Sequence, residues 1–337
     1  MRAVFLIACL LFGCTKSAEA QRAFFFWRTT FTLTPAERER LTAHHVSRLY
    51  LRLFDVSWNP QAARVEPVGL TAFAESTPAG LEVVPVVFLR NEIFTHDADP
   101  AALAVQLQSL VKARARVGAF GFRELQVDCD WTDSTREAFF SFCRALRTGL
   151  EADGATLSAT IRLHQVKYAQ RTGVPPVERG MLMFYNVGRL AADAERPSIF
   201  NAQDAARYTA SIDAYPLPLD AALPVFSWAV QSRSGRVVDL LSKPDLDELA
   251  KNPSLERAGT GRYVARTPSF VAGGYVQPGD ALSLEVMTPA ASREAAELLA
   301  RHFHPRTPFT ISLFDLDERN LHAWSPDDLD AVFSAVR

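Results

Sequence analysis

The chain has 337 residues, of which 48% are hydrophobic and 22% are charged, values that are ordinary for a globular protein with a large core. Its formal net charge is −2 at pH 7, and no run of lysine and arginine interleaved with aromatic residues is visible. Because a protein that binds a phosphate backbone needs a local surplus of positive charge, nucleic acid is not expected as a partner.

The N-terminal stretch MRAVFLIACLLFGC has the layout of a secretory signal. One arginine precedes an apolar run that is too short to span a bilayer, and the small residue Gly13 stands directly before Cys14. The ending LFGC resembles the lipobox of bacterial lipoproteins, in which the cysteine is lipidated. We therefore expect a signal peptide over residues 1–13, lipidation of Cys14 and a tether over 14–22. The protein would be exported and held at the outer membrane or in the periplasm by its lipid anchor alone. A plain secretory signal cleaved elsewhere is the alternative.

Eight short apolar or β-branched runs follow, most of them bounded by turn residues or charges. Helical patterns lie between most of them, and the first offers Thr34 as N-cap with Pro35 at the first helical position. The runs cover residues 23–30, 48–56, 81–89, 124–130, 156–164, 181–187, 222–230 and 309–316. This alternation of strand and helix predicts an α/β fold of the (β/α)8 TIM-barrel type, with residues 23–337 as one domain.

Two connections depart from a plain barrel. The one over residues 57–80 holds only a short helical piece. The other is a long insertion over residues 231–308. Its turn-forming Gly-Gly and Pro-Gly-Asp sequences at 273–280 indicate a β-hairpin before a final helix. The simplest interpretation is a β-containing subdomain on the connection after the seventh strand.

The fourth run, ELQVDCD, carries two aspartates on one face. Side chains alternate along a barrel strand, so Asp128 and Asp130 point inward while Val127 and Cys129 face the helices. The same alternation turns Arg52 of the second run and Arg162 of the fifth inward. A buried arginine needs an acid, and Asp128 is the natural partner of one of them. A structural ion-pair network is therefore one interpretation of these aspartates.

The ends of the other predicted strands also gather polar and aromatic side chains. Active sites of such barrels lie at the carboxyl ends of the strands. A rim that mixes aromatic rings with carboxylates and amides suits a sugar, whose faces stack on rings while its hydroxyls form hydrogen bonds. The candidate binding residues on this rim are Trp27, Arg28, Asp55, Arg90, Trp131, Tyr185, Asn186 and Trp228.

The stretch VDCDW at 127–131, together with FYN at 184–186, resembles the chitinase-like glycoside hydrolases of family eighteen, in which a DxDxE motif ends strand four and a tyrosine follows on strand six. The resemblance matches Asp128 and Asp130 to the two aspartates, Trp131 to the following aromatic and Tyr185 to the tyrosine. It departs at the proton-donating glutamate, whose position is occupied by Thr132. The chain is also similar to bacterial lipoproteins related to glycosidases.

The leading hypothesis is a glycoside hydrolase-like lipoprotein that acts on carbohydrate at the cell envelope. Because a threonine cannot deliver the proton, such an enzyme needs a replacement acid. The candidates for the catalytic machinery are Asp128, Asp130, Glu92, His164 and Asp317. One alternative is a non-catalytic barrel that binds a glycan or a partner protein. Another is a structural lipoprotein, in which Arg52 and Arg162 neutralise the inward aspartates.

The remaining motifs indicate no cofactor and no metal. No GxSxG, HExxH, P-loop or GxGxxG stands out, and the cysteines have no zinc-site spacing. Cys129 and Cys143 are either a disulfide or two buried thiols. His302 and His304 lie at the end of a predicted helix, where a surface role or an interaction with the helix dipole is expected.

Overall fold

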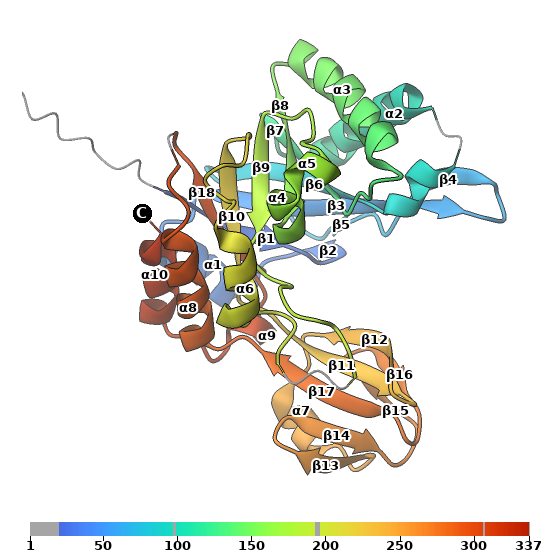
Figure 1. Ribbon diagram of the computed structural model, residues 1–337, viewed down its shortest axis with the longest axis vertical. Coiled ribbons are helices and arrows are strands. Elements are labelled where there is room, and N and C mark those ends of the chain that lie inside the picture. Colours follow the sequence, from blue (N-terminus) through green and yellow to red (C-terminus); the bar gives the residue numbers. More distant parts are fainter. Residues whose placement is uncertain (1–19, 97–98, 193–195, 306, 337) are drawn as a thin grey trace, which may run out of the picture.

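The computed structural model describes residues 20–96, 99–192, 196–305 and 307–336 (Figure 1). Within these residues, parallel strands follow one another around a closed barrel, because the first strand pairs with both the second and the last. The barrel strands are β1 Gln21–Phe26, β3 Arg48–Asn59, β6 Glu82–Leu89, β7 Glu124–Cys129, β8 Thr156–Arg162, β9 Arg179–Met183, β10 Leu219–Pro224 and β18 Thr310–Phe314. The predicted TIM barrel is confirmed.

Helices cover the outside of the barrel, and their sequences explain where they begin. In α1, Thr34 caps the helix by accepting a hydrogen bond from the amide of Glu37 at 3.2 Å. In α3, the buried residues Phe139, Phe142, Leu146 and Leu150 recur at helical spacing and turn one face to the strands. The helical elements around the barrel are α1 Pro35–Ala43, η1 Asn91–Thr95, α2 Pro100–Val117, α3 Arg136–Ala152, α4 Leu163–Lys167, α5 Ala169–Thr172, α6 Ala202–Thr209, α8 Pro289–Ala300, α9 Glu318–Leu321 and α10 Pro326–Ala335.

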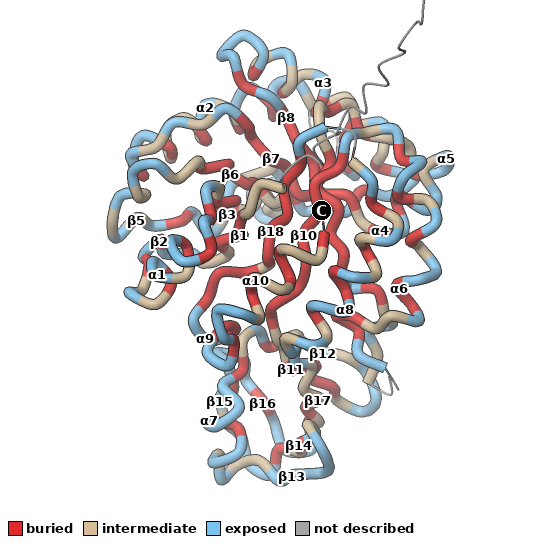
Figure 2. The backbone as a smooth tube through the Cα atoms, turned by 90° about the vertical axis from the view of Figure 1, so that its left-hand side faces the viewer, coloured by how far each residue is buried: buried red, intermediate tan, exposed pale blue. Residues whose placement is uncertain are grey.

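The barrel strands form the buried centre of the molecule, as the burial colouring of Figure 2 shows. Aromatic rings fill part of the interior. The ring of Phe25 stacks on Tyr50 with their centroids 4.8 Å apart, and it also contacts Phe314 at 5.4 Å. Such close packing fills this part of the barrel interior with side chains, as is usual for barrels of this type.

The insertion after the seventh barrel strand forms a separate sheet, which projects from the barrel in Figure 1. Its antiparallel strands run in the order β12-β11-β17-β14-β13, beside a hairpin of β15 and β16. A small core that includes Leu241, Tyr263 and Leu282 lies under them. The elements are β11 Ser227–Arg233, β12 Arg236–Ser242, α7 Leu246–Lys251, β13 Leu255–Gly259, β14 Arg262–Ala265, β15 Ser269–Val271, β16 Gly274–Val276 and β17 Ala281–Val286. The expected β-containing insertion is confirmed, and α8 after it belongs to the core of the barrel.

Two local predictions were wrong. Residues 57–80 form no helix: β3 extends to Asn59 and pairs with β4 (Arg64–Val68), while β5 (Ala72–Phe73) pairs with β2 (Thr30–Phe31). The run 222–230 is not one strand, because β10 ends at Pro224, which has no N–H to donate to a neighbouring strand. The chain then leaves the barrel and continues as β11 of the insertion sheet.

A buried carboxylate at the amino ends of the strands predicts an unusual pH dependence of stability. Burial raises the pKa of Asp220 to about 6, although Arg179 lies 3.1 Å away and the Thr310 amide donates a hydrogen bond at 2.7 Å. Because this pKa is higher in the folded than in the unfolded chain, ionisation of Asp220 destabilises the fold above about pH 6, and the loss is recovered as the pH falls toward 4.

We therefore expect Asp220→Asn to raise the free energy of unfolding at pH 7 by up to about 3 kcal/mol, and to leave it nearly unchanged at pH 4. Denaturant titrations of both proteins across this range measure the effect. A difference between the two proteins that stays constant from pH 7 to pH 4 would contradict the assignment.

Candidate functional site

A pocket of about 390 Å³ lies at the carboxyl ends of the barrel strands, where the insertion sheet meets the barrel; we call it the main pocket. Its lining residues come from or directly follow seven of the barrel strands, and from the insertion. They are Trp27, Asp55, Phe88, Asp128, Asp130, Arg162, Met183, Tyr185, Asn186, Phe226, Ser227, Trp228, Ser242, Lys243, Phe314 and Asp315. Of the thirteen residues proposed as catalytic or binding groups, Asp55, Asp128, Asp130, Trp27, Tyr185, Asn186 and Trp228 lie here.

Arg162 joins the two aspartates at the end of β7, Asp128 and Asp130. Its Nε donates to Asp130 Oδ1 at 2.5 Å, and its Nη2 lies 3.2 Å from Asp128 Oδ1, which also accepts a hydrogen bond from Thr160 Oγ1 at 2.6 Å. The Asp128 side chain is buried, whereas that of Asp130 is about half exposed (55%). Burial raises the pKa of Asp128, and the nearby Arg162 counteracts only part of that rise. One guanidinium is therefore shared by two carboxylates.

A second cation, Lys243 of the insertion, is also shared by two carboxylates, on the other side of the pocket. Lys243 Nζ donates to Asp315 Oδ2 at 2.6 Å and to Asp317 Oδ2 at 2.9 Å. Asn320 Nδ2 donates to the other oxygen of Asp315 at 2.7 Å. Burial raises the pKa of Asp315; partial burial also acts on Asp317, but Lys243 brings the pKa of Asp317 below its usual value. Lys243 therefore neutralises part of the charge of the two aspartates that follow β18.

Arg52 pairs with Asp55 and not with Asp128 or Asp130 at the end of β7. Its Nη2 lies 2.7 Å from Asp55 Oδ1, and its Nη1 donates to the carbonyl of Gly69 at 2.9 Å. Of the two arginines weighed as partners of Asp128, the structure thus brings only Arg162 to it. Among the described residues, each of the four carboxylates that line the main pocket has a cationic partner.

Aromatic rings form the rest of the wall. Trp27 contacts Phe314 with ring centroids 5.5 Å apart, and Trp228 contacts Phe226 at 5.4 Å. The Tyr185 ring packs against Phe226 at 5.5 Å, and burial raises the pKa of its hydroxyl. The pocket therefore combines flat apolar surfaces with carboxylates that accept hydrogen bonds, the combination that a pyranose ring requires.

Six of the sequence-predicted residues lie outside the main pocket. Trp131 is buried in the helix layer, where its ring stacks on Phe139 at 5.1 Å and its Nε1 donates to the Thr172 carbonyl. Asp317 and Arg28 lie behind Lys243, and Arg28 Nη2 is 2.8 Å from Glu37 Oε2. The other three, Arg90, Glu92 and His164, are exposed beyond the lining.

Thr132 is exposed and does not line the pocket. Its hydroxyl lies 3.0 Å from Ser134 Oγ and 3.2 Å from Thr135 Oγ1, and its amide donates to Thr135 Oγ1 at 2.9 Å. The residue therefore stabilises the turn that leads into α3. It supplies no titratable group to the site.

The sequence pattern did not identify Lys243, and it placed Asp315 at the rim without including it among the catalytic or binding candidates. It treated Arg162 only as a structural partner. Asp315 directly follows β18, as Asp130 directly follows β7, so its position in the sequence placed it at the carboxyl ends of the barrel strands. Nothing local marks Lys243, because it lies sixteen residues into the insertion, after Ser227. Cys129 and Cys143, for which a disulfide was one alternative, are both buried free thiols.

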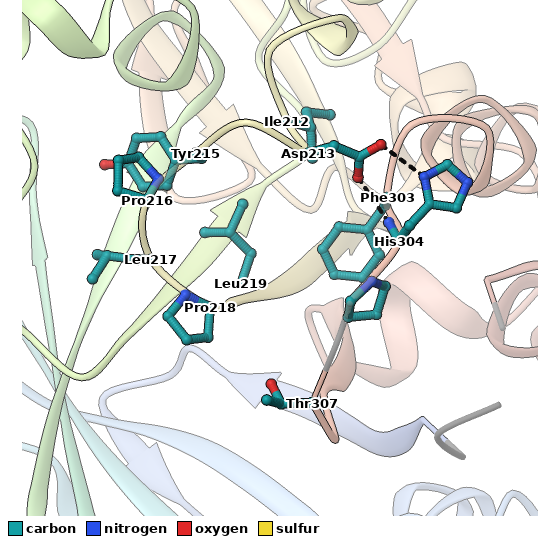
Figure 3. A pocket seen from close by; sticks show the side chains of 11 residues that line it. Ile212, Asp213, Tyr215, Pro216, Leu217, Pro218, Leu219, Phe303, His304 and Thr307 are labelled. Carbon is teal, nitrogen blue, oxygen red and sulfur yellow. Dashed lines mark hydrogen bonds and ion pairs between the residues drawn. The ribbon is translucent and has the colours of Figure 1, made fainter. Parts of the chain in front are cut away.

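Another pocket, of about 280 Å³, lies at the opposite end of the barrel, beside the first residues of β10 and the segment before β18. Leu217, Pro218 and Phe303 surround it, and the carboxylate of Asp213 points toward His304 (Figure 3). His304 Nδ1 lies 2.7 Å from Asp213 Oδ2, and its amide donates to Oδ1 at 2.9 Å. His304 thus closes a surface loop in the described structure.

The described part of the chain holds no cluster of three or more His, Cys, Asp or Glu side chains arranged to bind a metal ion. Within the same residues, no helix has both the length and the apolar character to cross a membrane.

Comparison with known proteins supports the architecture. No protein-family model and no curated protein matches the chain. Among solved structures, the chain is similar to a chitinase from Chromobacterium violaceum (13% identity, 94% of this chain and 98% of that chain, TM-score 0.54) and to a class V chitinase from Pseudomonas fluorescens (15%, 94% and 100%, 0.54). A spore cortex-lytic enzyme from Bacillus megaterium matches at 11% identity over 93% of this chain and 75% of that one, with a TM-score of 0.50. These similarities show a shared chitinase-like TIM-barrel fold.

Proposed function

We propose that the main pocket binds a carbohydrate residue without hydrolysing it. The observation that carries this proposal is the combination of aromatic walls with carboxylates that all have cationic partners. A general acid must hold a proton at the working pH, whereas an ion pair favours the ionised carboxylate. Thr132, at the position of the family's proton donor, lies outside the pocket lining.

Glycoside hydrolysis is the second candidate, and the environment of Asp128 favours it. Burial raises the pKa of Asp128, while the neighbouring Asp130 is half exposed in the same pocket. Two carboxyls whose environments differ in this way can act as a general acid and a base. A screen of reporter glycosides with the wild-type chain and Asp130→Asn separates the candidates: turnover lost in the variant would establish a hydrolase and overturn simple binding.

Trp228 provides the direct test of carbohydrate binding. We expect Trp228→Ala to weaken the affinity for any glycan found on a glycan array by about tenfold, because a stacking surface worth ~1.4 kcal/mol is lost. Calorimetric titration measures the change. Phe270→Ala is the matched control, since Phe270 is an exposed aromatic of the insertion (70%) that does not line the pocket. An equal loss in both variants, or none in Trp228→Ala, would count against the pocket as the glycan site.

We also propose that the chain is exported and held at the cell envelope by a lipid on Cys14, a residue outside the described part. β1 begins at Gln21, whose amide donates to the Phe309 carbonyl at 2.8 Å, at the end of the barrel opposite the main pocket. Residues 15–20 span at most about 20 Å, so an anchor at Cys14 would hold that end near the membrane and turn the pocket away from it. Mass spectrometry of the N-terminal peptide tests this, and an unmodified Cys14 would refute it.

A further inference from the structure

A second pocket of about 570 Å³ lies directly behind the main pocket; we call it the side pocket. Three chain segments contribute neighbouring residues to both. The main pocket receives Trp27, Lys243 and Asp315, and the side pocket receives Arg28, Pro244 and Asp317 from the same segments. The complete lining of the side pocket is Arg28, Thr34, Pro244, Asp245, Leu246, Asp247, Asp317, Glu318, Arg319 and His322. The two pockets therefore adjoin, and these three segments form the partition between them.

The partition is an ionic bridge. Lys243 Nζ lies 2.6 Å from Asp315 Oδ2 and 2.9 Å from Asp317 Oδ2, so its ammonium group joins a residue of one pocket to a residue of the other. Arg28 Nη1 approaches the same Asp317 oxygen at 3.8 Å. The three side chains of the Lys243 bridge are mostly buried, at 17%, 1% and 7% exposure. Such a desolvated bridge is held more firmly than a surface ion pair.

The insertion places Lys243 at this point. Lys243 directly follows β12, its amide donates to the Ser227 carbonyl at 3.0 Å, and its φ of 56° turns the backbone sharply between β12 and α7. A positive φ is uncommon for a residue other than glycine. The insertion sheet thus directs the Lys243 side chain toward Asp315 and Asp317, which follow the barrel strand β18.

We propose that Lys243 is a specificity-determining residue, which closes the main pocket on the side of the side pocket and restricts it to the end of a glycan chain. The proposal rests on carbohydrate binding at the main pocket. With the bridge in place, a sugar in the main pocket has no path for further units toward the side pocket. Without it, the two cavities join, and the charged side chains of the side pocket offer hydrogen-bond partners to additional sugar units.

The test compares short and long oligosaccharides on the full-length chain. The probes are the dimer and the hexamer of three series of neutral β-linked oligosaccharides, built from N-acetylglucosamine, glucose and mannose. For the wild type, we expect the dimer and hexamer of a bound series to have affinities within about threefold of each other. For Lys243→Ala, we expect the hexamer to bind about tenfold more tightly than the dimer.

Two further variants keep the test interpretable. Lys243→Ala leaves Asp315 buried without its cation, so Lys243→Ala/Asp315→Asn removes that charge and preserves folding if the single variant unfolds. Lys251→Ala, an exposed lysine at the end of α7 in the same insertion, is the matched control and should behave as the wild type does.

The outcomes separate this inference from the proposed function. In one outcome, one of the three oligosaccharide series binds while Lys243→Ala and Lys243→Ala/Asp315→Asn keep the wild-type ratio of hexamer to dimer affinity. That result would overturn the role of Lys243 and leave carbohydrate binding in place. If no series binds to the wild type, both fail. A hexamer preference that appears in the two Lys243 variants and is absent from Lys251→Ala supports the proposal.

Discussion

Replacement of Arg162 by methionine is expected to destabilise the fold by about 3–5 kcal/mol at pH 7, the range found when one partner of a buried ion pair is removed. Methionine preserves much of the side-chain volume but leaves Asp128 buried beside Asp130 with no cation. Denaturant titration measures the loss. We also expect glycan binding to disappear, because two adjacent carboxylates would repel each other at the pocket wall.

A pH series identifies the cause of this loss. Burial already raises the pKa of Asp128 in the wild-type chain, and without Arg162 the rise is greater. The buried carboxyl therefore takes up a proton more readily as the pH falls, and the loss of stability in Arg162→Met should become smaller toward acidic pH. Arg171→Met is the control, since Arg171 and its partner Asp133 are both largely exposed, and it should cost at most about 1 kcal/mol. A deficit independent of pH would point to lost packing instead of an unpaired charge.

Removal of the Glu285 carboxylate is expected to separate the insertion from the barrel at the edge of the pocket. One oxygen, Oε2, accepts hydrogen bonds from the Ser198 amide and hydroxyl, both at 2.8 Å, and from the Ile199 amide and Trp228 Nε1, both at 3.0 Å. Ser198 and Ile199 are buried. Each buried donor that is left without an acceptor lowers the free energy of unfolding by roughly 1–3 kcal/mol. Glu285→Ala should therefore destabilise the chain by about 2–5 kcal/mol.

The same substitution should also weaken glycan binding, because the Trp228 indole loses the bond that orients it. Hydrogen exchange at Ser198 and Ile199 and calorimetric titration measure the two effects. Glu256→Ala is the matched control: Glu256 lies on β13 of the insertion and pairs with Arg266, and both side chains are exposed. Unchanged exchange in Glu285→Ala would show that other contacts hold the insertion in place.

The charge balance of the main pocket bears on the proposed carbohydrate ligand. Four carboxylates (Asp55, Asp128, Asp130 and Asp315) and two cations (Arg162 and Lys243) line the main pocket, so its described wall has an excess of acceptor oxygens. Sugar hydroxyls donate to such oxygens, while the rings of Trp27, Trp228 and Phe226 cover the apolar face. Under the proposal of carbohydrate binding, these oxygens accept hydrogen bonds from the ligand while every lining carboxylate stays close to a positive charge.

The amino-acid sequence by itself determined the barrel. Alternation of short apolar runs with amphipathic helices is a local property, and each run except 222–230 marked one barrel strand because burial on both faces requires continuous apolar residues. The run 222–230 covers the end of β10 and the start of β11. Strand parity also placed Asp128 and Asp130 together on the face that lines the pocket, since neighbouring side chains of a strand point to opposite faces. The turn residues at 273–280 correctly indicated the β-containing insertion.

Only the tertiary structure decided which strand-end residues meet. Glu92 and Arg90 follow a barrel strand as Asp315 does, yet they are exposed outside the lining while Asp315 is buried within it. Lys243 enters the pocket from an insertion whose direction depends on the break after Pro224 and on the pairing of β11 with β12 and β17. Such contacts join residues dozens of positions apart, and they depend on how loops and sheets pack in three dimensions, which local propensity and periodicity do not encode.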